Sequence, residues 1–524
     1  MTLLTIQEAS KWAAALLKQD ISPSNISYLV QYGRVRKYQL NGTTKIALKD
    51  LQKYYKSFHG QREVDWKKIL GDDLNWALSF DHLHEKDTTK NVHRLHPYKG
   101  KFIPQLVEYF LDEHTDDFKK KVYFRKNDIV LDPFLGSGTT LVQAHELGMH
   151  GIGIDISQFN CVIAECKIQS YDLQTLEKAI QDMKEYLNRT EIDSHLQEFE
   201  EELISLLSAI NAKYFPHPSF KYKVHRREIA EDTYARAREK ECLPLYHALL
   251  KKYNIRLQSQ KGTTFLDTWY VDTIRREIQE TFEYIKKQSA PEIKKILAVI
   301  LSRAARSCRA TTHSDLATLK EPQLDIYYCY KHKKICKPLF SMRKMLERYA
   351  DDTLARLQRF SALRTPALYC IIAGDSRTVD IAEAVQKTPP LASLLQKEKI
   401  RGIFSSPPYV GQIDYHEQHA YAYDLFGFPR RDASEIGPLC KGQGKQARES
   451  YIDSITTVLH NCKRYLAEDY DVFLVANDKW NLYPLIAEKT DMQIVQRFKR
   501  PVLNRTERDR NPYSETIFHL KQKV

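Results

Sequence analysis

DIVLDPFLGSGTTLVQAHELGMHGIGIDIS, residues 128–157, is the stretch of this 524-residue chain that decides the fold. Its first apolar run ends at Asp132 and is followed by a turn with two glycines, a helical stretch and a second apolar run that ends at Asp155. The order strand, turn, helix, strand is typical of a parallel α/β sheet. The glycines let the backbone approach a ligand closely, and the following helix presents free N–H groups at its start. We therefore predict a ligand site at this edge of the sheet.

Asp155 is expected at the tip of the second strand. An acidic side chain there can accept hydrogen bonds from both ribose hydroxyls of a nucleoside cofactor. The alternative interpretation is that Asp155 caps the following helix. Dinucleotide dehydrogenases use a related arrangement, but their G-x-G-x-x-G spacing is absent from this turn, which counts against a NAD enzyme.

A second element, Ser406-Pro407-Pro408-Tyr409, follows the apolar strand expected at residues 400–404. Together with DPFLGSGTT, this tetrapeptide resembles the amino-directed DNA methyltransferases, whose paired signatures are an F-x-G-x-G cofactor loop and an (S/D/N)-P-P-(Y/F) catalytic sequence. The resemblance covers roughly residues 95–155 and 368–524. It implies a seven-stranded Rossmann-like α/β methyltransferase core, S-adenosylmethionine as cofactor and double-stranded DNA as substrate.

The resemblance also implies the residues that bind the cofactor. In members of the family, the segment that corresponds to HPYKGKF, residues 96–102, caps the methionine end of the cofactor. The aspartate that corresponds to the one in AGDSR, residues 373–377, contacts the adenine ring. That aspartate, Asp375, has the alternative role of forming a turn. The expected cofactor-binding set is Lys101, Phe102, Asp132, Pro133, Phe134, Gly136, Ser137, Gly138, Thr139, Asp155 and Asp375.

The tetrapeptide has a chemical rationale. The lone pair of an exocyclic amino group is delocalised into the base, so acceptors aimed at its two N–H bonds are needed to expose it to a methyl sulfonium. The Ser406 hydroxyl and the Pro407 carbonyl suit this role, and Pro407 and Pro408 stiffen the loop. Tyr409 offers a face on which a flipped base can stack. The expected catalytic residues are Ser406, Pro407, Pro408 and Tyr409.

The identity of the target base can be predicted from the tetrapeptide and from the absence of a Pro-Cys dipeptide. Methylation at C5 of cytosine needs a thiolate, usually in a Pro-Cys dipeptide, and none of the 20 prolines precedes a cysteine. Serine in the first tetrapeptide position usually accompanies N4-cytosine in this family, so N4 of cytosine is the expected target. The alternatives are an N6-adenine DNA methyltransferase, an RNA guanine-N2 methyltransferase, and a DNA-binding regulator with an inactive methyltransferase body.

Four segments follow from the changes in pattern along the chain. Residues 1–60 combine helix, turn, helix and a hairpin around Asn41-Gly42, which resembles the winged-helix head of excisionase or MerR-type proteins. We expect the cofactor half of the core at 61–170, a helical insertion at 171–365 and the catalytic half at 366–524. The winged-helix residues expected to contact DNA are Ser24, Asn25, Tyr28, Arg34, Arg36 and Lys37.

The insertion separates the two halves as a target-recognition region does in this family. A segment dense in Lys and Arg, residues 221–241, lies within the insertion and is the candidate for reading the DNA site. The alternative interpretation is that these charges belong to a solvated helical face. The segment's expected DNA contacts are Lys223, Arg226 and Arg227.

Two further segments raise questions about ligands. We expect residues 410–428 to line the base pocket, with Asp414 or Tyr415 near the target. Cys329, His332 and Cys336 offer three zinc ligands, with Cys308 or His313 as a fourth, but their spacing matches no standard zinc knuckle. Buried thiols are the favoured interpretation, so no metal site is predicted.

The composition agrees with a polyanionic partner. The net charge is +13 and the sequence pI is about 9.0, which favours binding to phosphates. No apolar run is long enough to span a membrane, the start of the chain lacks signal-peptide features, and nine scattered cysteines suit a reducing cytoplasm. A cognate restriction endonuclease is implied only through the family.

Overall fold

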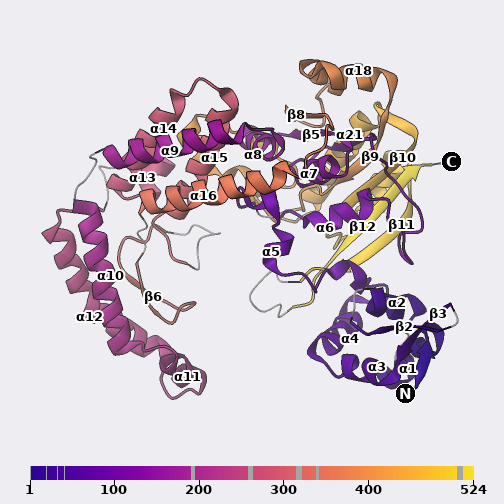
Figure 1. The fold of residues 1–524 in the computed structure, drawn as a ribbon, viewed down its shortest axis with the longest axis horizontal. Coiled ribbons are helices and arrows are strands. Elements are labelled where there is room, and N and C mark those ends of the chain that lie inside the picture. Colours follow the sequence, from indigo (N-terminus) through magenta and orange to yellow (C-terminus); the bar gives the residue numbers. More distant parts are fainter. Residues whose placement is uncertain are drawn as a thin grey trace.

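The computed structural model describes residues 2–18, 21–31, 34–40, 42–98, 100–190, 195–257, 264–313, 321–337, 341–503 and 511–523. Three parts are visible in Figure 1: a central α/β core, a long helical region on one side of it, and a small module at the N-terminus.

The core is a seven-stranded sheet with the strand order β11-β12-β10-β9-β4-β5-β8. Its strands pair in parallel except β12, which is antiparallel to both of its neighbours. The expected mixed α/β, Rossmann-like sheet is therefore confirmed. The strands are β4 (Ile129–Asp132), β5 (His150–Asp155), β8 (Tyr369–Ala373), β9 (Ile400–Ser405), β10 (Leu466–Ala476), β11 (Met492–Pro501) and β12 (Ser514–Gln522).

Both faces of the sheet are covered, which explains why β4 is buried along its whole length. Ile129 and Leu131 pack on one face with α18, α21 and α22, while Val130 points to the other face, toward α6. The helices beside the sheet are α6 (Pro104–Leu111), α7 (Thr139–Glu146), α8 (Gln158–Ile168), α17 (Ile381–Ala384), α18 (Pro389–Lys397), α19 (Tyr415–Gln418), α20 (Ala420–Phe426), α21 (Lys445–Lys463) and α22 (Tyr483–Lys489).

The helical insertion lies between α8 and β8, where the sequence places it. A layer of α9, α14, α15 and α16 packs beside α8, and α10, α11 and α12 form an arm that extends away from the core (Figure 1). One apolar cluster runs continuously from Leu135 in the glycine turn to Phe360 in α16, so insertion and core share their interior. The elements are α9 (Leu173–Arg189), α10 (His195–Tyr214), α11 (Ser219–His225), α12 (Glu231–Lys252), α13 (Phe265–Trp269), α14 (Asp272–Lys286), α15 (Pro291–Ser307), α16 (Met342–Ser361), β6 (Tyr327–Cys329) and β7 (Lys334–Cys336).

The N-terminal module contains the expected helices and hairpin. Its three-stranded sheet has the order β1-β3-β2, and Gly42 in the hairpin turn has a φ of 73°, while Asn41 lies outside the described residues. The module's apolar core continues past residue 60 to Ala77. Its elements are β1 (Leu3–Thr5), α1 (Ile6–Leu17), α2 (Pro23–Gln31), β2 (Lys37–Leu40), β3 (Thr43–Ala47), α3 (Leu48–Tyr55) and α4 (Phe58–Leu70), followed by the short α5 (Glu85–Thr88).

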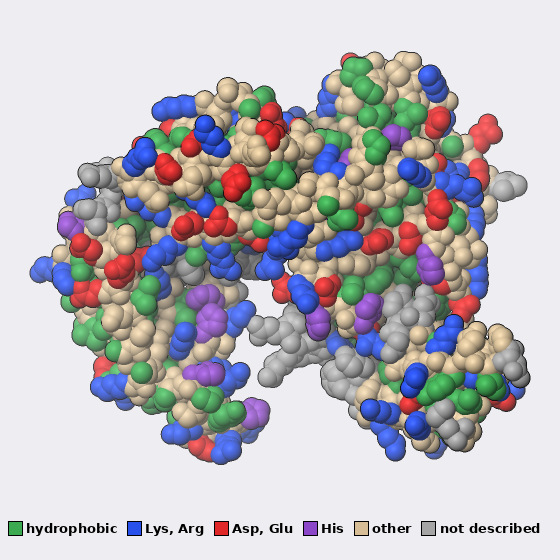
Figure 2. Space-filling view, viewed as in Figure 1, with side chains coloured by type: hydrophobic (Ala, Val, Ile, Leu, Met, Phe, Trp, Pro, Cys, Tyr) green, Lys and Arg blue, Asp and Glu red, His purple; other side chains and the backbone are tan. Residues whose placement is uncertain are grey.

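The module is joined to the last strands of the sheet. The amide of Asn75 donates a hydrogen bond of 2.6 Å to the carbonyl of Lys499 in β11. Figure 1 shows the arm and the module on the same side of the core. Figure 2 shows an open hollow between them, with Lys and Arg side chains on both. Within the described part of the chain, no helix has the length and apolar character that crossing a membrane requires.

Candidate active site

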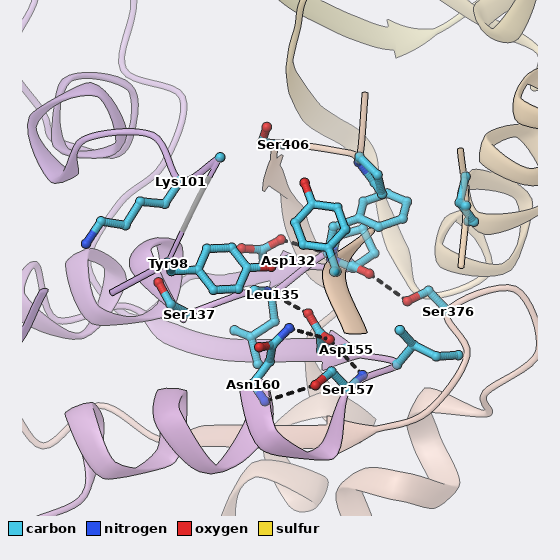
Figure 3. Close-up of a pocket in the computed structure, with 18 of the residues that line it drawn as sticks. Tyr98, Lys101, Asp132, Leu135, Ser137, Asp155, Ser157, Asn160, Ser376 and Ser406 are labelled. Carbon is cyan, nitrogen blue, oxygen red and sulfur yellow. Dashed lines mark hydrogen bonds between the residues drawn. The ribbon is translucent and has the colours of Figure 1, made fainter. Parts of the chain in front are cut away.

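A cavity lies at the carboxyl ends of β4, β5, β8 and β9, with about 860 Å³ of empty space that includes solvent outside its mouth. Ligands of open α/β sheets bind at this edge, where the order of the strands reverses. The glycine turn after β4 and the tetrapeptide after β9 both line it (Figure 3). The structure thus brings the two sequence elements together. Their predicted residues in the lining are Lys101, Phe102, Asp132, Pro133, Phe134, Gly136, Ser137, Thr139, Asp155, Asp375, Ser406 and Pro408.

Both glycines of the turn have a left-handed backbone that other residues rarely adopt. Gly136 has a φ of 50°, and a Cβ there would lie 3.1 Å from the ring of Tyr98. Gly138 has a φ of 79° and precedes α7, and its Cβ would lie 2.7 Å from Ala164. Between them, the buried Ser137 hydroxyl has no hydrogen-bond partner among the described residues. A polar ligand with a free donor or acceptor fits this arrangement.

Asp155 organises the floor of the cavity (Figure 3). Its Oδ2 accepts a hydrogen bond of 2.7 Å from the amide of Gly136, and its Oδ1 accepts one of 2.8 Å from Ser157 and one of 3.1 Å from Asn160. Burial nevertheless raises the pKa of Asp155 to about 6. A carboxylate has about four acceptor positions, so one remains on Oδ2 for a ligand hydroxyl. Ser157, and not Asp155, is the N-cap of α8.

Asp132 connects the two halves of the site. Its Oδ1 accepts hydrogen bonds of 2.6 Å from the Ser405 hydroxyl and 3.1 Å from the amide of Phe134. The side chain is buried, and burial raises the pKa of Asp132 to about 6. A further bond, from the hydroxyl of Thr140 to the carbonyl of Phe404, measures 3.1 Å. These bonds fix the distance between the glycine turn and the tetrapeptide.

Lys101 and Asp375 line the cavity, but their charged groups already have partners. The ammonium of Lys101 donates a hydrogen bond of 2.7 Å to the carbonyl of His93, and burial lowers its pKa to about 8. The Asp375 carboxylate accepts a bond of 2.6 Å from Arg377, and Arg377 together with the turn around it holds the pKa of Asp375 below its ordinary value. Both residues therefore shape the wall while their charges point to protein groups.

Two of the four tetrapeptide residues line the cavity, and the other two lie behind its wall. Ser406 and Pro408 line the cavity, whereas Pro407 and Tyr409 are not part of its wall. The hydroxyl of Tyr409 donates a hydrogen bond of 2.8 Å to Glu515 in β12, which in turn lies 3.5 Å from the buried guanidinium of Arg500. Two strands of the sheet thus fix the ring of Tyr409.

Sequence reasoning missed several lining residues, most of which come from outside the glycine turn and the tetrapeptide. Tyr98 stacks on Tyr415 with 6.0 Å between ring centroids, and Glu435 accepts hydrogen bonds from the amides of Tyr415 and His416. Tyr415 lies within the segment expected to line the site, while Asp414 accepts a bond from the amide of Cys440. Tyr98, Gly100, Leu135, Ile156, Ser157 and Ser376 lie in segments that the sequence singles out, whereas no local pattern marks the others. The missed residues are Tyr98, Gly100, Leu135, Ile156, Ser157, Asn160, Ser376, Ser434, Glu435 and Ile436.

The expected DNA contacts of the N-terminal module differ in accessibility. Arg36 and Lys37 are exposed, Ser24 and Asn25 are half-buried in α2, and the guanidinium of Arg34 pairs with Asp81. Tyr28 belongs to α2, and its side chain lies outside the described part of the structure.

The expected contacts in the insertion are all exposed. Lys223, Arg226 and Arg227 lie in and directly after α11, at the tip of the arm (Figure 1).

Comparison with known proteins gives a consistent result. A family model described as DNA methylase of the N6/N4 group matches residues 26–165. The type II methyltransferase M.MjaII of Methanocaldococcus jannaschii is 50% identical over 527 residues, which cover 99% of this chain and 97% of that protein. M.BsoBI of Geobacillus stearothermophilus is 34% identical over 104 residues, 20% of this chain and 19% of its own. M.MvaI of Kocuria varians is 35% identical over 121 residues, 22% of this chain and 24% of its own. No solved structure matches the chain.

Proposed function

This chain belongs to the N6/N4 family of type II DNA methyltransferases, which use S-adenosylmethionine, and we propose that it methylates N4 of cytosine in duplex DNA. The observation that carries the proposal is Ser406, the first tetrapeptide residue, on the wall of the cavity that also holds the glycine turn. The sequence resemblance associates serine in this position with N4-cytosine.

The cavity suits the donor molecule. S-adenosylmethionine supplies a methyl group on a sulfonium, a good leaving group, so the reaction needs no strong base. The remaining acceptor position on Asp155 suits a ribose hydroxyl, and the Ser137 hydroxyl, which has no partner in the part of the chain that the structure describes, can bond a polar group of the donor. Carboxylates of Asp132, Asp155 and Glu435 in the wall favour a ligand that carries positive charge.

The tetrapeptide acts on the base. The Ser406 hydroxyl and the Pro407 carbonyl accept hydrogen bonds from the exocyclic amino group and turn its lone pair toward the methyl group. Pro408 has no N–H group to compete for these acceptors. Tyr409 stacks on the flipped cytosine, and its bond to Glu515 keeps the ring in one orientation.

The duplex approaches from the side where the arm and the N-terminal module stand. The module resembles a winged helix in its order of elements, and we assign DNA contacts to Arg36 and Lys37 there and to Lys223, Arg226 and Arg227 on the arm. Lys and Arg side chains bind phosphates, which positions the protein on the duplex, and they also make the commonest specific contacts, to guanine in the major groove. A cognate restriction endonuclease is the partner that a type II methyltransferase implies.

N6 of adenine is the second candidate, because both bases present an amino group at a similar edge. Membership of a DNA methyltransferase family does not favour the RNA guanine-N2 alternative or an inactive regulator.

The test is to incubate the purified protein with duplex DNA and S-adenosylmethionine, digest the DNA to nucleosides and identify the product by mass spectrometry. N4-methylcytosine is expected. N6-methyladenine would retain the mechanism but overturn the base assignment. Bound cofactor without a methylated nucleoside would overturn the proposed reaction.

A further inference from the structure

Four potential metal ligands meet in the helical insertion, far along the chain from the catalytic elements. Cys329 ends β6, Cys336 ends β7, and His332 lies in the turn between these two strands. His313 follows α15 and reaches the same place from another segment. One ligand atom from each of the four side chains lies within 4.8 Å of the other three.

The spacing of these atoms matches a tetrahedral ion. The Nδ1 of His332 lies 3.6 Å from the Sγ of Cys329 and 3.6 Å from the Sγ of Cys336. Around zinc, with Zn–S of about 2.3 Å and Zn–N of about 2.0–2.1 Å, a tetrahedral sulfur-to-nitrogen edge is about 3.6 Å. The rings of His313 and His332 are 4.5 Å apart between centroids and steeply inclined, so each presents a nitrogen from its own direction.

The surroundings resemble those of a structural site. Cys329 and Cys336 are buried, with exposed fractions of 2% and 6%. The Nδ1 of His313 lies 2.6 Å from the hydroxyl of Tyr327, and the amide of His313 donates a bond of 2.8 Å to the same hydroxyl. If Nδ1 of His313 donates to Tyr327, the lone pair of its Nε2 is directed to the ligand cluster, as an outer partner usually arranges for a metal-binding histidine.

We propose that His313, Cys329, His332 and Cys336 bind one structural Zn²⁺ ion. Two thiolates and two imidazoles in tetrahedral geometry favour zinc among the biological divalent metals, and four protein ligands leave no open position for catalysis. Two thiolates also balance the charge of the ion, so the buried site is neutral.

A disulfide explains the same cluster less well. Cys329 pairs with Lys334 and Cys336 pairs with Tyr327 in the hairpin register, so the two cysteines are not opposite each other, and both thiols are free. A disulfide between Cys329 and Cys336 would also not explain why the side chains of His313 and His332 lie beside the two thiols. Cys308, the other cysteine near this region in sequence, does not belong to the cluster.

The ion would join two parts of the insertion. The hairpin is attached to the arm, because the side-chain amide of Asn211 in α10 bonds both the carbonyl and the amide of Ile335 at 2.9 Å. Glu239 in α12 accepts a bond of 3.1 Å from the amide of Tyr328. His313, in contrast, follows α15 in the layer that packs beside the core. Zinc therefore fixes the arm to that layer, a structural role that does not depend on which base the enzyme methylates.

The test starts with the metal content of the purified full-length protein, measured by inductively coupled plasma mass spectrometry after dialysis against a mild chelator. We expect about one zinc ion per chain, as for a closed four-ligand site. The double variant Cys329→Ser, Cys336→Ser should lose the zinc. Cys308→Ser, a matched change at a buried cysteine of the same insertion, should keep it. Zinc retained in the double variant, or a wild type without stoichiometric metal, would overturn the proposal.

A second measurement needs no variant. Protein refolded or expressed with Co²⁺ in place of zinc should show the visible absorption of a tetrahedral cobalt site with a thiolate charge-transfer band. Detection of a Cys329–Cys336 disulfide by non-reducing peptide mapping of freshly purified protein would overturn the proposal, as would an octahedral cobalt spectrum.

Discussion

The hydroxyl of Ser405 donates a hydrogen bond of 2.6 Å to the carboxylate of Asp132, and both side chains are buried. Ser405 ends β9 directly before the tetrapeptide of residues 406–409, and Asp132 ends β4 directly before the glycine turn. This bond joins the glycine turn to the tetrapeptide, the two elements that meet on the wall of the cavity.

We predict that Ser405→Ala destabilises the protein by about 2 kcal/mol, because a buried charged acceptor loses a donor. The loss should appear in chemical unfolding of the cofactor-free protein. Ser406→Ala is the matched control, since Ser406 has no bond to Asp132, and it should leave the unfolding free energy nearly unchanged. Equal destabilisation by both changes would contradict the role assigned to this bond.

Asp132 should make stability depend on pH. Its pKa rises from 3.8 to about 6 in the folded protein, so folding favours the protonated form. The corresponding stabilisation is complete below about pH 4 and is lost as the pH rises through 6, a change of roughly 3 kcal/mol. Asp132→Asn removes this dependence. Its unfolding free energy relative to wild type should therefore rise between pH 4 and 6 and level off above; a difference that is flat with pH would refute the prediction.

Gly136→Ala should weaken S-adenosylmethionine binding about tenfold, roughly 1.4 kcal/mol, because the new Cβ meets the ring of Tyr98 at 3.1 Å and displaces the wall of the cavity. Isothermal titration calorimetry measures the effect. Gly427→Ala is the control: Gly427 also has a positive φ, 68°, but a Cβ there meets no atom within 4 Å. Gly427→Ala introduces a backbone strain similar to that of Gly136→Ala, but it should leave the affinity for S-adenosylmethionine unchanged. A normal affinity in Gly136→Ala would argue against cofactor binding at this turn.

Ser406→Ala and Asp155→Ala should separate catalysis from binding. Loss of the Ser406 acceptor should reduce kcat about 10²-fold with little effect on the dissociation constant for S-adenosylmethionine. Asp155→Ala should mainly weaken cofactor binding, since it removes the acceptor for a ribose hydroxyl and for the amide of Gly136. Single-turnover rates at saturating cofactor distinguish the two. Equal effects of both changes on cofactor binding would contradict the assignment.

The tip of the arm should contribute electrostatically to DNA binding. A triple alanine variant should bind duplex DNA less tightly and lower the slope of log affinity against log salt by up to about 2.7. A second triple variant with the same charge change, on the far side of the core near α18, should leave that slope unchanged. If the two variants behave alike, the arm does not contact phosphates. The test set is Lys223, Arg226 and Arg227, and the control set is Lys387, Lys397 and Lys399.

The regular part of the molecule could be predicted from the sequence because its signals are local. Apolar runs that end at Asp132, Asp155 and Ser405 mark parallel strands, and parallel strands bring their carboxyl ends to one edge. The glycine turn and Ser406 therefore had to meet, whatever the length of the insertion between them.

The remaining residues of the site depend on packing over long distances. Glu435 reaches the cavity because its carboxylate bonds the amides of Tyr415 and His416, and nothing in its own loop indicates this. Lys101 lines the cavity, but its ammonium bonds the carbonyl of His93, a partner that no sequence pattern indicates. His313 lies in another segment from Cys329, so sequence spacing alone gave no standard zinc motif.

The interior shared by insertion and core has a consequence for the construction of chimeras of this enzyme. The apolar cluster passes from Leu141 in α7 through Phe159 in α8 to Ile296 in α15, without a boundary at residue 171. A chimera that exchanges the whole insertion would therefore expose apolar side chains on both sides of the junction. The same cluster continues through Phe199 in α10 and Tyr246 in α12, so a graft of the distal arm, α10 to α12 with the hairpin of β6 and β7, must bring matching apolar side chains at its base and must keep His313 beside the hairpin.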